Sequence, residues 1–295
     1  MEKSLSNVAW HLEEPRVGQS YPNYYIAKEA SKFVKVILSG AGGDELFGGY
    51  PWRYYRTTVN NNFDDYIDKY YLYWQRLLDN SQLKKIFLPI YSETKNVWTR
   101  DIFANVFKTR QKSIQRPVDY INHSLYFEAK TFLHGLFVVE DKLSMASSIE
   151  TRLPFMDNDV VDFAMNCPVD LKLKNIDNIV RLNENFPGNK TAKYFQRTND
   201  GKKILRDVMS KYLPIEIIDG KKQGFSSPDA SWFKNQSISF VKDKLINGNP
   251  RLYNILDGDS IIPLINEHLS GKENRRLLIW SLLNVEYFLC QHDLN

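Results

Sequence analysis

The stretch from Phe33 to Tyr50, FVKVILSGAGGDELFGGY, limits the fold of this chain more than any other segment. Residues 34–38 are mostly aliphatic and contain neither glycine nor proline, which predicts a short buried β-strand. The glycines of the following loop, residues 39–43, allow a tight turn that exposes backbone N–H groups. Asp44 and Glu45 come next, where a helix is predicted to begin. The segment therefore predicts one strand–loop–helix unit of an α/β fold.

This unit suits a ligand made of phosphate and a hard cation. Backbone N–H groups can face phosphate oxygens, and a carboxylate can supply an oxygen ligand to Mg²⁺. The loop is not of the Walker A type, because no Gly-Lys-Ser/Thr closes it, and its third glycine is displaced from the pattern G-x-G-x-x-G. Spacing alone leaves a second interpretation open, a tight strand-to-helix turn capped by Asp44.

The order Ser-Gly-x-Gly-Gly-Asp-Glu-Leu-Phe-Gly-Gly-Tyr over residues 39–50 resembles the pyrophosphate-side loop of the asparagine synthase family, the ATP-dependent amide-forming enzymes. The resemblance implies that Asp44 is a catalytic residue and a ligand of Mg²⁺. It also implies a set of nucleotide-binding residues in this loop: Ser39, Gly40, Gly42, Gly43, Asp44 and Glu45.

The amino-acid composition limits the classes of protein to which this chain can belong. The 295 residues are 43% hydrophobic and 25% charged, which is ordinary for a soluble globular protein. The formal charge of +4 is spread along the chain and does not call for nucleic acid. Cys167 and Cys290 form no Cys-x-x-Cys pair, which argues against a disulfide scaffold or a zinc site. No apolar run has the length of a membrane span and no signal peptide is recognised, so we expect a cytoplasmic protein with neither membrane nor nucleic-acid partners.

The segment before the strand is predicted to be irregular over residues 2–24, because it is polar and contains Pro15, Gly18 and Pro22. Residues 11–15, His-Leu-Glu-Glu-Pro, resemble the Asp-Glu-Pro stretch that precedes the loop in the same family, which would place Glu13 or Glu14 near the active site. A solvated acidic turn is the favoured alternative. Residues 24–33 have helical spacing of apolar side chains and predict a helix leading into the strand.

Aromatic residues dominate the next predicted helix, at positions 66, 70, 73 and 74 with Leu77. A stacking platform for single-stranded nucleic acid is one interpretation, but basic residues are not interleaved on that face, so we expect core. Shorter helices are predicted over residues 83–88 and 103–107.

The clearest helix seam consists of Leu136, Val139, Leu143, Ala146 and Ile149, ending before Pro154. It lies in VVEDKLSMASSIETRLPFMDNDVVDFAM, which resembles the family signature Asp-Lys/Arg-x-x-Met-Ala…Glu-x-Arg-x-Pro-Phe-x-Asp.

Asp141 and Glu150 lie in this predicted helix, and their spacing places them about 180° apart, so at most one faces a nucleotide. We favour Asp141. Glu150, Arg152 and Asp157 are expected to form a buried ion-pair and capping network.

A third resemblance lies in the last part of the chain, where residues 219–225 read Asp-Gly-Lys-Lys-Gln-Gly-Phe. The lysine of the family's Lys-x-x-Phe motif reaches the phosphates and the acyl-adenylate, and Lys222 is the matching residue. The resemblance therefore makes Lys222 a catalytic and nucleotide-binding residue, and a solvated turn is the alternative. Helices are predicted over residues 202–212, 232–246 and 275–288.

The predicted fold class is α/β and predominantly helical. The resemblance implies a partial parallel sheet of the PP-loop ATPase, or adenine-nucleotide α-hydrolase-like, type, followed by a helical body. No composition break marks a boundary, so we expect one domain, 1–295, a partial synthetase domain with a remnant of the α/β core in 1–52 and helices in 53–295. We also expect the shortened sheet to leave an exposed edge.

The three matches span roughly residues 10–290 in family order. They imply a carbon–nitrogen ligase that adenylates a carboxylate with ATP and Mg²⁺ and then lets ammonia displace AMP. Aspartate to asparagine is the most expected reaction, with ammonia derived from glutamine by a separate N-terminal glutaminase domain. A homo-oligomer is one possibility that the sequence leaves open.

Two departures from the family pattern limit this interpretation. The family's first nucleotide loop, Ser-Gly-Gly-x-Asp-Ser, and the N-terminal cysteine of the glutaminase domain are both missing, which predicts the C-terminal part of a longer enzyme. Ala41 stands where asparagine-forming members carry glutamate, and a methyl group offers no acid–base chemistry. Two alternatives therefore remain: a relative that amidates another carboxylate, such as a sugar or peptide, and a non-catalytic fragment or partner subunit.

Overall fold

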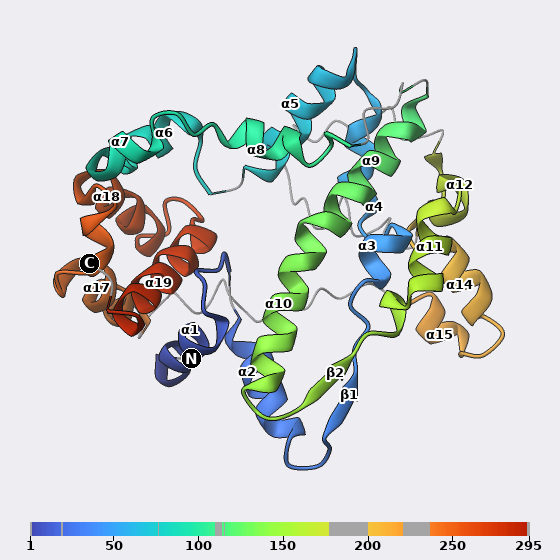
Figure 1. Ribbon diagram of the computed structural model, residues 1–295, viewed down its shortest axis with the longest axis horizontal. Helices are drawn as coiled ribbons and strands as arrows, with labels where there is room; N and C mark the ends of the chain where they lie inside the picture. Colours follow the sequence, from blue (N-terminus) through green and yellow to red (C-terminus); the bar gives the residue numbers. More distant parts are fainter. Residues whose placement is uncertain are drawn as a thin grey trace.

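The computed structural model describes residues 2–18, 20–75, 77–109, 114, 116–176, 200–220 and 237–293, except the side chains of residues 55 and 56 (Figure 1). Within this part the chain is mostly helical, with one small parallel sheet, which confirms an α/β class dominated by helices. The PP-loop ATPase-like topology and the division at residue 52 stay predictions.

Two helices replace the irregular segment predicted for residues 2–24: α1 (Glu2–Leu12) and α2 (Tyr21–Ala30). The prediction gave too much weight to polarity, because Leu5, Val8 and Leu12 recur at helical spacing and are buried in a core shared with α19. Pro22 lies in the first turn of α2, where its missing N–H costs no intrahelical hydrogen bond. The helix predicted over residues 24–33 is confirmed and begins three residues earlier.

The sheet consists of β1 (Val36–Leu38) and β2 (Glu150–Arg152), which run parallel with Val36 opposite Glu150 and Leu38 opposite Arg152. The strand after residue 34 is confirmed, but its predicted burial is wrong. Val36 is 50% and Leu38 75% exposed, while Ile37 and Thr151 are half-buried on the opposite face. Because only two strands pair in the described part, each has a free edge, as expected for a shortened sheet.

β2 was not predicted. The helix expected through Ile149 ends at Met145, and Ser148 then takes a left-handed conformation, φ 53°, that turns the chain into the strand. Asp141 and Glu150 therefore do not share a helix, and the argument from their angular separation does not apply. Glu150 and Arg152 do form an ion pair of 2.9 Å, but both side chains are more than half exposed, so the predicted burial of this network is wrong. Asp157 caps the next helix, accepting the N–H of Asp159 at 3.0 Å.

The remaining helices are α3 (Gly43–Phe47), α4 (Pro51–Tyr55), α5 (Phe63–Trp74), α6 (Asn80–Ile86), α7 (Tyr91–Thr94), α8 (Thr99–Asn105), α9 (Pro117–Lys130), α10 (Phe132–Met145), α11 (Asn158–Asn166), α12 (Val169–Lys172), α14 (Lys203–Met209), α15 (Ile215–Ile218), α17 (Ser237–Lys242), α18 (Gly258–Leu269) and α19 (Arg276–Gln291). A π-helical turn, Asp243–Asn247, extends α17. Of the helix predicted over residues 232–246, the first part lies outside the described residues. The helices predicted near residues 83, 103, 202 and 275 are confirmed with shifted ends.

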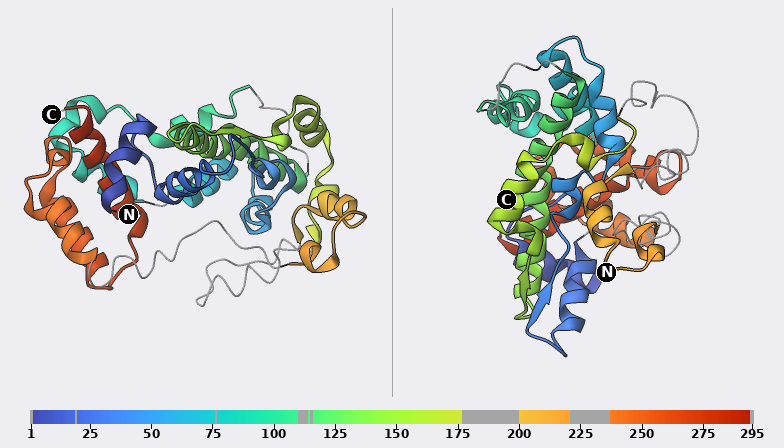
Figure 2. Two further views of the ribbon diagram at one scale, coloured as in Figure 1. Left: turned by 90° about the horizontal axis from the view of Figure 1, so that it is seen from below. Right: turned by 90° about the vertical axis from the view of Figure 1, so that its right-hand side faces the viewer.

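The helices form groups around α9 and α10, which run through the middle of the molecule (Figure 1). On one side α1, α6, α17, α18 and α19 share the larger apolar core, and on the other side α11, α12, α14 and α15 lie together (Figures 1 and 2). An aromatic core joins α5, α8 and α9, where Tyr66 and Tyr70 are buried. The prediction that the tyrosines of this helix are core is therefore confirmed for these two residues.

Among the described helices, none combines the length and the apolar character that a membrane span requires.

Candidate functional site

The loop 39–43 joins the carboxyl end of β1 to α3, and the sheet fixes its start. The N–H of Ser39 donates to the carbonyl of Arg152 at 2.9 Å, which continues the pairing of β1 with β2. The Ser39 hydroxyl then accepts the N–H of Ala41 at 3.2 Å. Gly42 adopts φ 94° as the N-cap of α3, and a Cβ there would lie 2.9 Å from the sulfur of Met156. Glycine is therefore required at 42 by both conformation and space.

Gly40, unlike Gly42, is exposed and has free space around its Cα. A Cβ added at this position would meet no atom within 4 Å, so packing does not explain the glycine. Within the described chain, no backbone hydrogen bond uses the N–H of Gly40 or Gly42 as donor. Gly40 is exposed and Gly42 is buried, so the N–H of Gly40 is the open donor here, a group of the kind that an anionic oxygen needs.

The structure separates the two adjacent carboxylates. Glu45 is only 2% exposed and accepts a hydrogen bond from the Tyr50 hydroxyl at 3.0 Å. Asp44 keeps a quarter of its side chain exposed, and its Oδ1 lies 2.9 Å from the ammonium Nζ of Lys202. The Asp44 side chain also lies against Gly49, where a Cβ would stand 1.7 Å from Oδ1. Asp44 is therefore the carboxylate that a ligand can reach, and Glu45 points into the protein.

Behind Glu45 lies a buried polar network that joins the loop to the helical body. The Arg53 guanidinium stacks on the Tyr50 ring, 3.8 Å from its centroid, and pairs with Glu128 at 3.2 Å. Glu128 is fully buried and also accepts the hydroxyls of Tyr54 and Tyr70, at 2.9 and 3.2 Å.

Burial dominates the electrostatics of this network. Desolvation raises the pKa of Glu128 above its ordinary value, an effect that the Arg53 charge opposes. Desolvation likewise raises the pKa of Tyr50 far above its ordinary value, with the nearby Glu45 and Asp44 carboxylates adding to it. Tyr50 therefore stays a neutral donor to Glu45, which holds the beginning of α3 in place.

Lys202 belongs to this site although no sequence pattern pointed to it. It lies just before α14, in a left-handed conformation with φ 56°, and its N–H donates to the carbonyl of Phe47 at 3.1 Å. Gly201 precedes it in close contact with the loop after α3, since a Cβ there would lie 2.4 Å from the carbonyl oxygen of Gly48. Only folding brings this lysine to Asp44. The sequence signal available was the basic pair at 202–203, which resembles an ordinary solvated helix start.

Of the other predicted site residues, the structure describes Glu14 and Asp141, and no hydrogen bond or ion pair between either of them and Asp44 is seen in the described chain. Glu14 pairs with Arg16 at 3.0 Å and is about half exposed. Asp141 is exposed on α10, next to Lys142, which bonds to Glu13 and to the carbonyl of Leu12. Lys222 lies outside the described residues.

The described residues contain no group of three or more His, Cys, Asp or Glu side chains that could hold a metal by themselves. A single reachable carboxylate nevertheless suits Mg²⁺, which typically binds proteins through one or two carboxylates together with substrate phosphates and water. The ammonium of Lys202 at Asp44 shows that this position favours a cation. Asp44 therefore fits a Mg²⁺–phosphate complex and not an all-protein cage.

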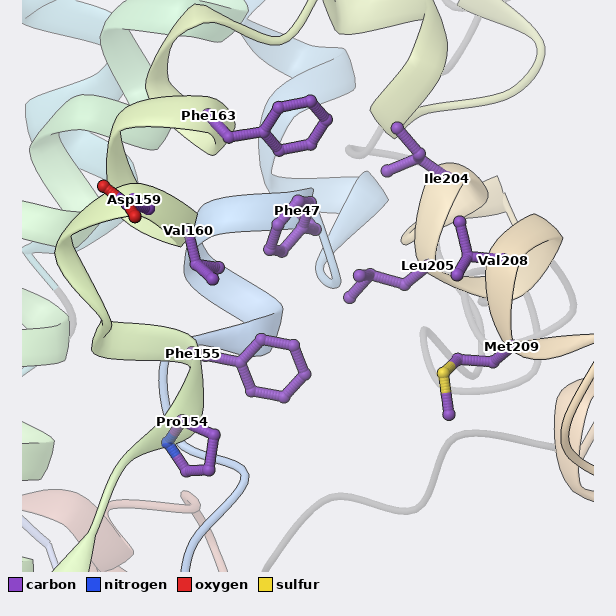
Figure 3. Close-up of a pocket in the computed structure, with 10 residues that line it drawn as sticks. All are labelled: Phe47, Pro154, Phe155, Asp159, Val160, Phe163, Ile204, Leu205, Val208 and Met209. Carbon is purple, nitrogen blue, oxygen red and sulfur yellow. The ribbon is translucent and has the colours of Figure 1, made fainter.

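An apolar cavity of about 450 Å³ lies beside α3 but is not this site. Phe47, Phe155 and Leu205 point toward one another across it, and Asp159 at its edge is its only charged lining residue (Figure 3). No predicted ligand-binding residue lines the cavity. It marks loose apolar packing between α3, α11 and α14, whereas a nucleotide needs polar partners.

Comparison with known proteins identifies the family of this strand–loop–helix unit and its helical body. The asparagine synthase family model matches residues 1–290, so this chain belongs to the asparagine synthase family.

Its relatives include asparagine synthetase [glutamine-hydrolyzing] 1 of Bacillus subtilis (strain 168), 28% identical over 99% of this chain and 45% of that protein. Asparagine synthetase [glutamine-hydrolyzing] 3 of the same organism is 27% identical over 89% of this chain and 39% of that protein. A more distant relative is the amidase chyE of Penicillium rubens, 20% identical over 77% of this chain and 38% of that protein. The chain thus spans less than half the length of these relatives.

Proposed function

We propose that this chain forms the synthetase part of an ATP-dependent amide-forming ligase, and that it adenylates a carboxylate for attack by ammonia. The observation that carries the proposal is the reachable Asp44 carboxylate at the exit of a glycine loop in which the exposed Gly40 donates its N–H to no backbone acceptor of the described chain. Membership of the asparagine synthase family over residues 1–290 supports it.

In the proposed reaction, a carboxylate oxygen of the acceptor attacks the α-phosphorus of ATP, and the bond to pyrophosphate breaks. Ammonia then attacks the acyl carbon, the bond to AMP breaks, and the ammonia loses a proton as the amide forms. Mg²⁺, when bound, neutralises charge on the phosphates.

The residues of this chain have separate roles in this proposal. In the loop 39–43 the exposed Gly40 donates its N–H to a pyrophosphate oxygen, and Asp44 provides the protein oxygen for the metal. Lys222, by its place in the family motif, donates to the departing pyrophosphate and stabilises the charge that develops there. Glu45, predicted as a nucleotide ligand, instead positions the loop, because it is buried against Tyr50.

The acceptor we propose is aspartate, since the similar bacterial proteins are named asparagine synthetases. A second candidate is a different carboxylate. Ala41 supports this alternative, because its half-buried methyl group offers no hydrogen bond where asparagine-forming members have glutamate. The ammonia donor we propose is glutamine, since the similar bacterial proteins are named glutamine-hydrolyzing.

The test is amide formation with the rest of the enzyme supplied. This chain would be co-expressed with the N-terminal portion of the Bacillus subtilis relative that it does not match, and assayed with ATP, Mg²⁺, aspartate and ¹⁵N-ammonium. We expect ¹⁵N in the side-chain amide of asparagine, with one AMP formed per amide. AMP formation with other carboxylates but not with aspartate would favour the second candidate. No AMP with any carboxylate tested would contradict the proposed function.

A further inference from the structure

Lys202 occupies the position beside Asp44 where a divalent cation would bind. Its Nζ lies 2.9 Å from Asp44 Oδ1, and both side chains are only about one-quarter to one-third exposed. A second cation at the same oxygen would be repelled by the ammonium. Metal binding at Asp44 and the Lys202–Asp44 ion pair therefore compete.

Contacts of the backbone around Lys202 fix the position of this lysine beside Asp44. Asp200 is buried, with its carbonyl accepting the N–H of Lys174 and its carboxylate accepting the side-chain amide of Asn175, both at 2.8 Å. Gly201 rests on the loop after α3, and Lys202 bonds through its N–H to the last residue of α3. The segment is thus held on both sides and presents Lys202 to Asp44.

The neighbouring Lys203 provides a contrast. Its ammonium donates to the carbonyl of Asp170 at 3.1 Å and does not take part in the Asp44 pair. Two adjacent lysines of equal charge therefore have different partners, and only one of them lies at the candidate metal ligand.

We infer that Lys202 makes the site selective for a metal that arrives together with phosphate. Free Mg²⁺ has to displace the Lys202 ammonium from Asp44, and the displaced ammonium then has no anion to pair with. A metal–pyrophosphate complex brings its own oxygens, which accept the displaced ammonium within one side-chain length of Asp44. Metal and phosphate thereby bind with positive coupling, each strengthening the other by the same factor. This inference rests on the metal role that the proposed function gives to Asp44.

The experiment measures Mn²⁺ binding to the full chain by electron paramagnetic resonance of the free ion, with and without inorganic pyrophosphate. For Lys202→Met we expect the dissociation constant for Mn²⁺ alone to fall about fivefold, because a competing unit charge has been removed. We expect the coupling between Mn²⁺ and pyrophosphate to fall about tenfold or more, since the ammonium no longer contacts the phosphate. Lys203→Met is the matched control and should keep both values.

The outcomes separate this inference from the proposed function. Equal Mn²⁺ affinity and coupling in the wild type and Lys202→Met would overturn the inference but leave Asp44 as a metal ligand. Absence of Mn²⁺ binding to both proteins, with and without pyrophosphate, would overturn the inference and the metal role of Asp44 together. Asp44→Asn identifies the site, because its loss of Mn²⁺ binding assigns the signal to this carboxylate.

Discussion

At the scale of single residues, the site depends on small contacts that a sequence motif does not reveal. Asp and Glu stand side by side in the motif, yet one is reachable and the other is buried against Tyr50. The difference arises because residues of a short helix point in different directions, and because Gly49 leaves room for the Asp44 side chain. The motif indicated which residues matter, and the fold assigned each a different role.

The glycines of the loop give a direct test of that geometry. Gly49→Ala would place a Cβ 1.7 Å from Asp44 Oδ1 and 2.8 Å from the Asp44 Cα, so both the carboxylate and the backbone of α3 would have to shift. We expect a less stable protein whose Mn²⁺–pyrophosphate affinity is lowered about tenfold or more, because the ligand oxygen has moved. Gly40→Ala meets no atom within 4 Å and should fold with unchanged stability. Equal metal affinity in Gly49→Ala and the wild type would contradict the placement of Asp44.

Lys172 is a buried lysine whose charge the fold tolerates poorly. It is 2% exposed, and desolvation lowers its pKa to about 8, an effect that the neighbouring Cys167 partly offsets. A lysine that binds its proton more weakly when folded opposes folding fully below pH 8. That penalty disappears as the pH rises from about 8 through the unfolded-state pKa of about 10.4.

We therefore predict that Lys172→Met stabilises the protein near pH 7 by roughly 1–3 kcal/mol, less than the full penalty because the new side chain must also pack. The gain should shrink between pH 8 and 10, as the wild-type lysine loses its proton. Urea denaturation at several pH values measures both effects. If Lys172→Met were less stable than the wild type at pH 7, or if its gain in stability grew with pH, burial of the Lys172 charge would not destabilise the fold.

At the scale of elements, helices with strong periodicity were predictable and chain turns were not. The aromatic helix α5 was correctly predicted from its spacing, since Tyr66 and Tyr70 alone place one face in the core. The turn at Ser148 was missed, because a left-handed serine leaves no mark in the sequence, and Ile149 continues the helical pattern by chance. Strand β2 was not predicted for the same reason. Its partner in the sheet is more than a hundred residues earlier in the chain, so local pattern cannot show the pairing.

The exposed face of β1 gives an element-scale prediction. Leu38 is 75% exposed, so Leu38→Thr should change the free energy of unfolding by no more than about 0.5 kcal/mol. Leu143 is fully buried in the main core, and Leu143→Ala should cost about 2–5 kcal/mol. Both are measured by urea denaturation of the purified chain. A large loss in Leu38→Thr would show that this face is covered in solution.

At the scale of the whole molecule, the helical body and the small sheet together position the candidate site. The helical body supplies a rigid base, in which the Arg53–Glu128 pair and its tyrosines connect α4, α5 and α9. The small sheet supplies the loop, and Tyr50 links the loop to that base through Glu45 and the Arg53 stack. The family and its motifs could be predicted from the sequence because the three motifs are local. The Lys202–Asp44 pair could not, because it depends on how α14 packs on α3.

ATP–pyrophosphate exchange is the sharpest test of the role proposed for Asp44, because it reports adenylation alone and needs no ammonia. It would compare wild type and Asp44→Asn, each co-expressed with the N-terminal portion of the Bacillus subtilis relative, with Mg²⁺ and aspartate. We predict exchange by the wild type and a loss of at least about a hundredfold in Asp44→Asn, because a neutral amide replaces the charged carboxylate that holds the metal. Equal exchange in both would contradict the role of Asp44 as metal ligand. No exchange by the wild type with any carboxylate would contradict the proposed adenylation.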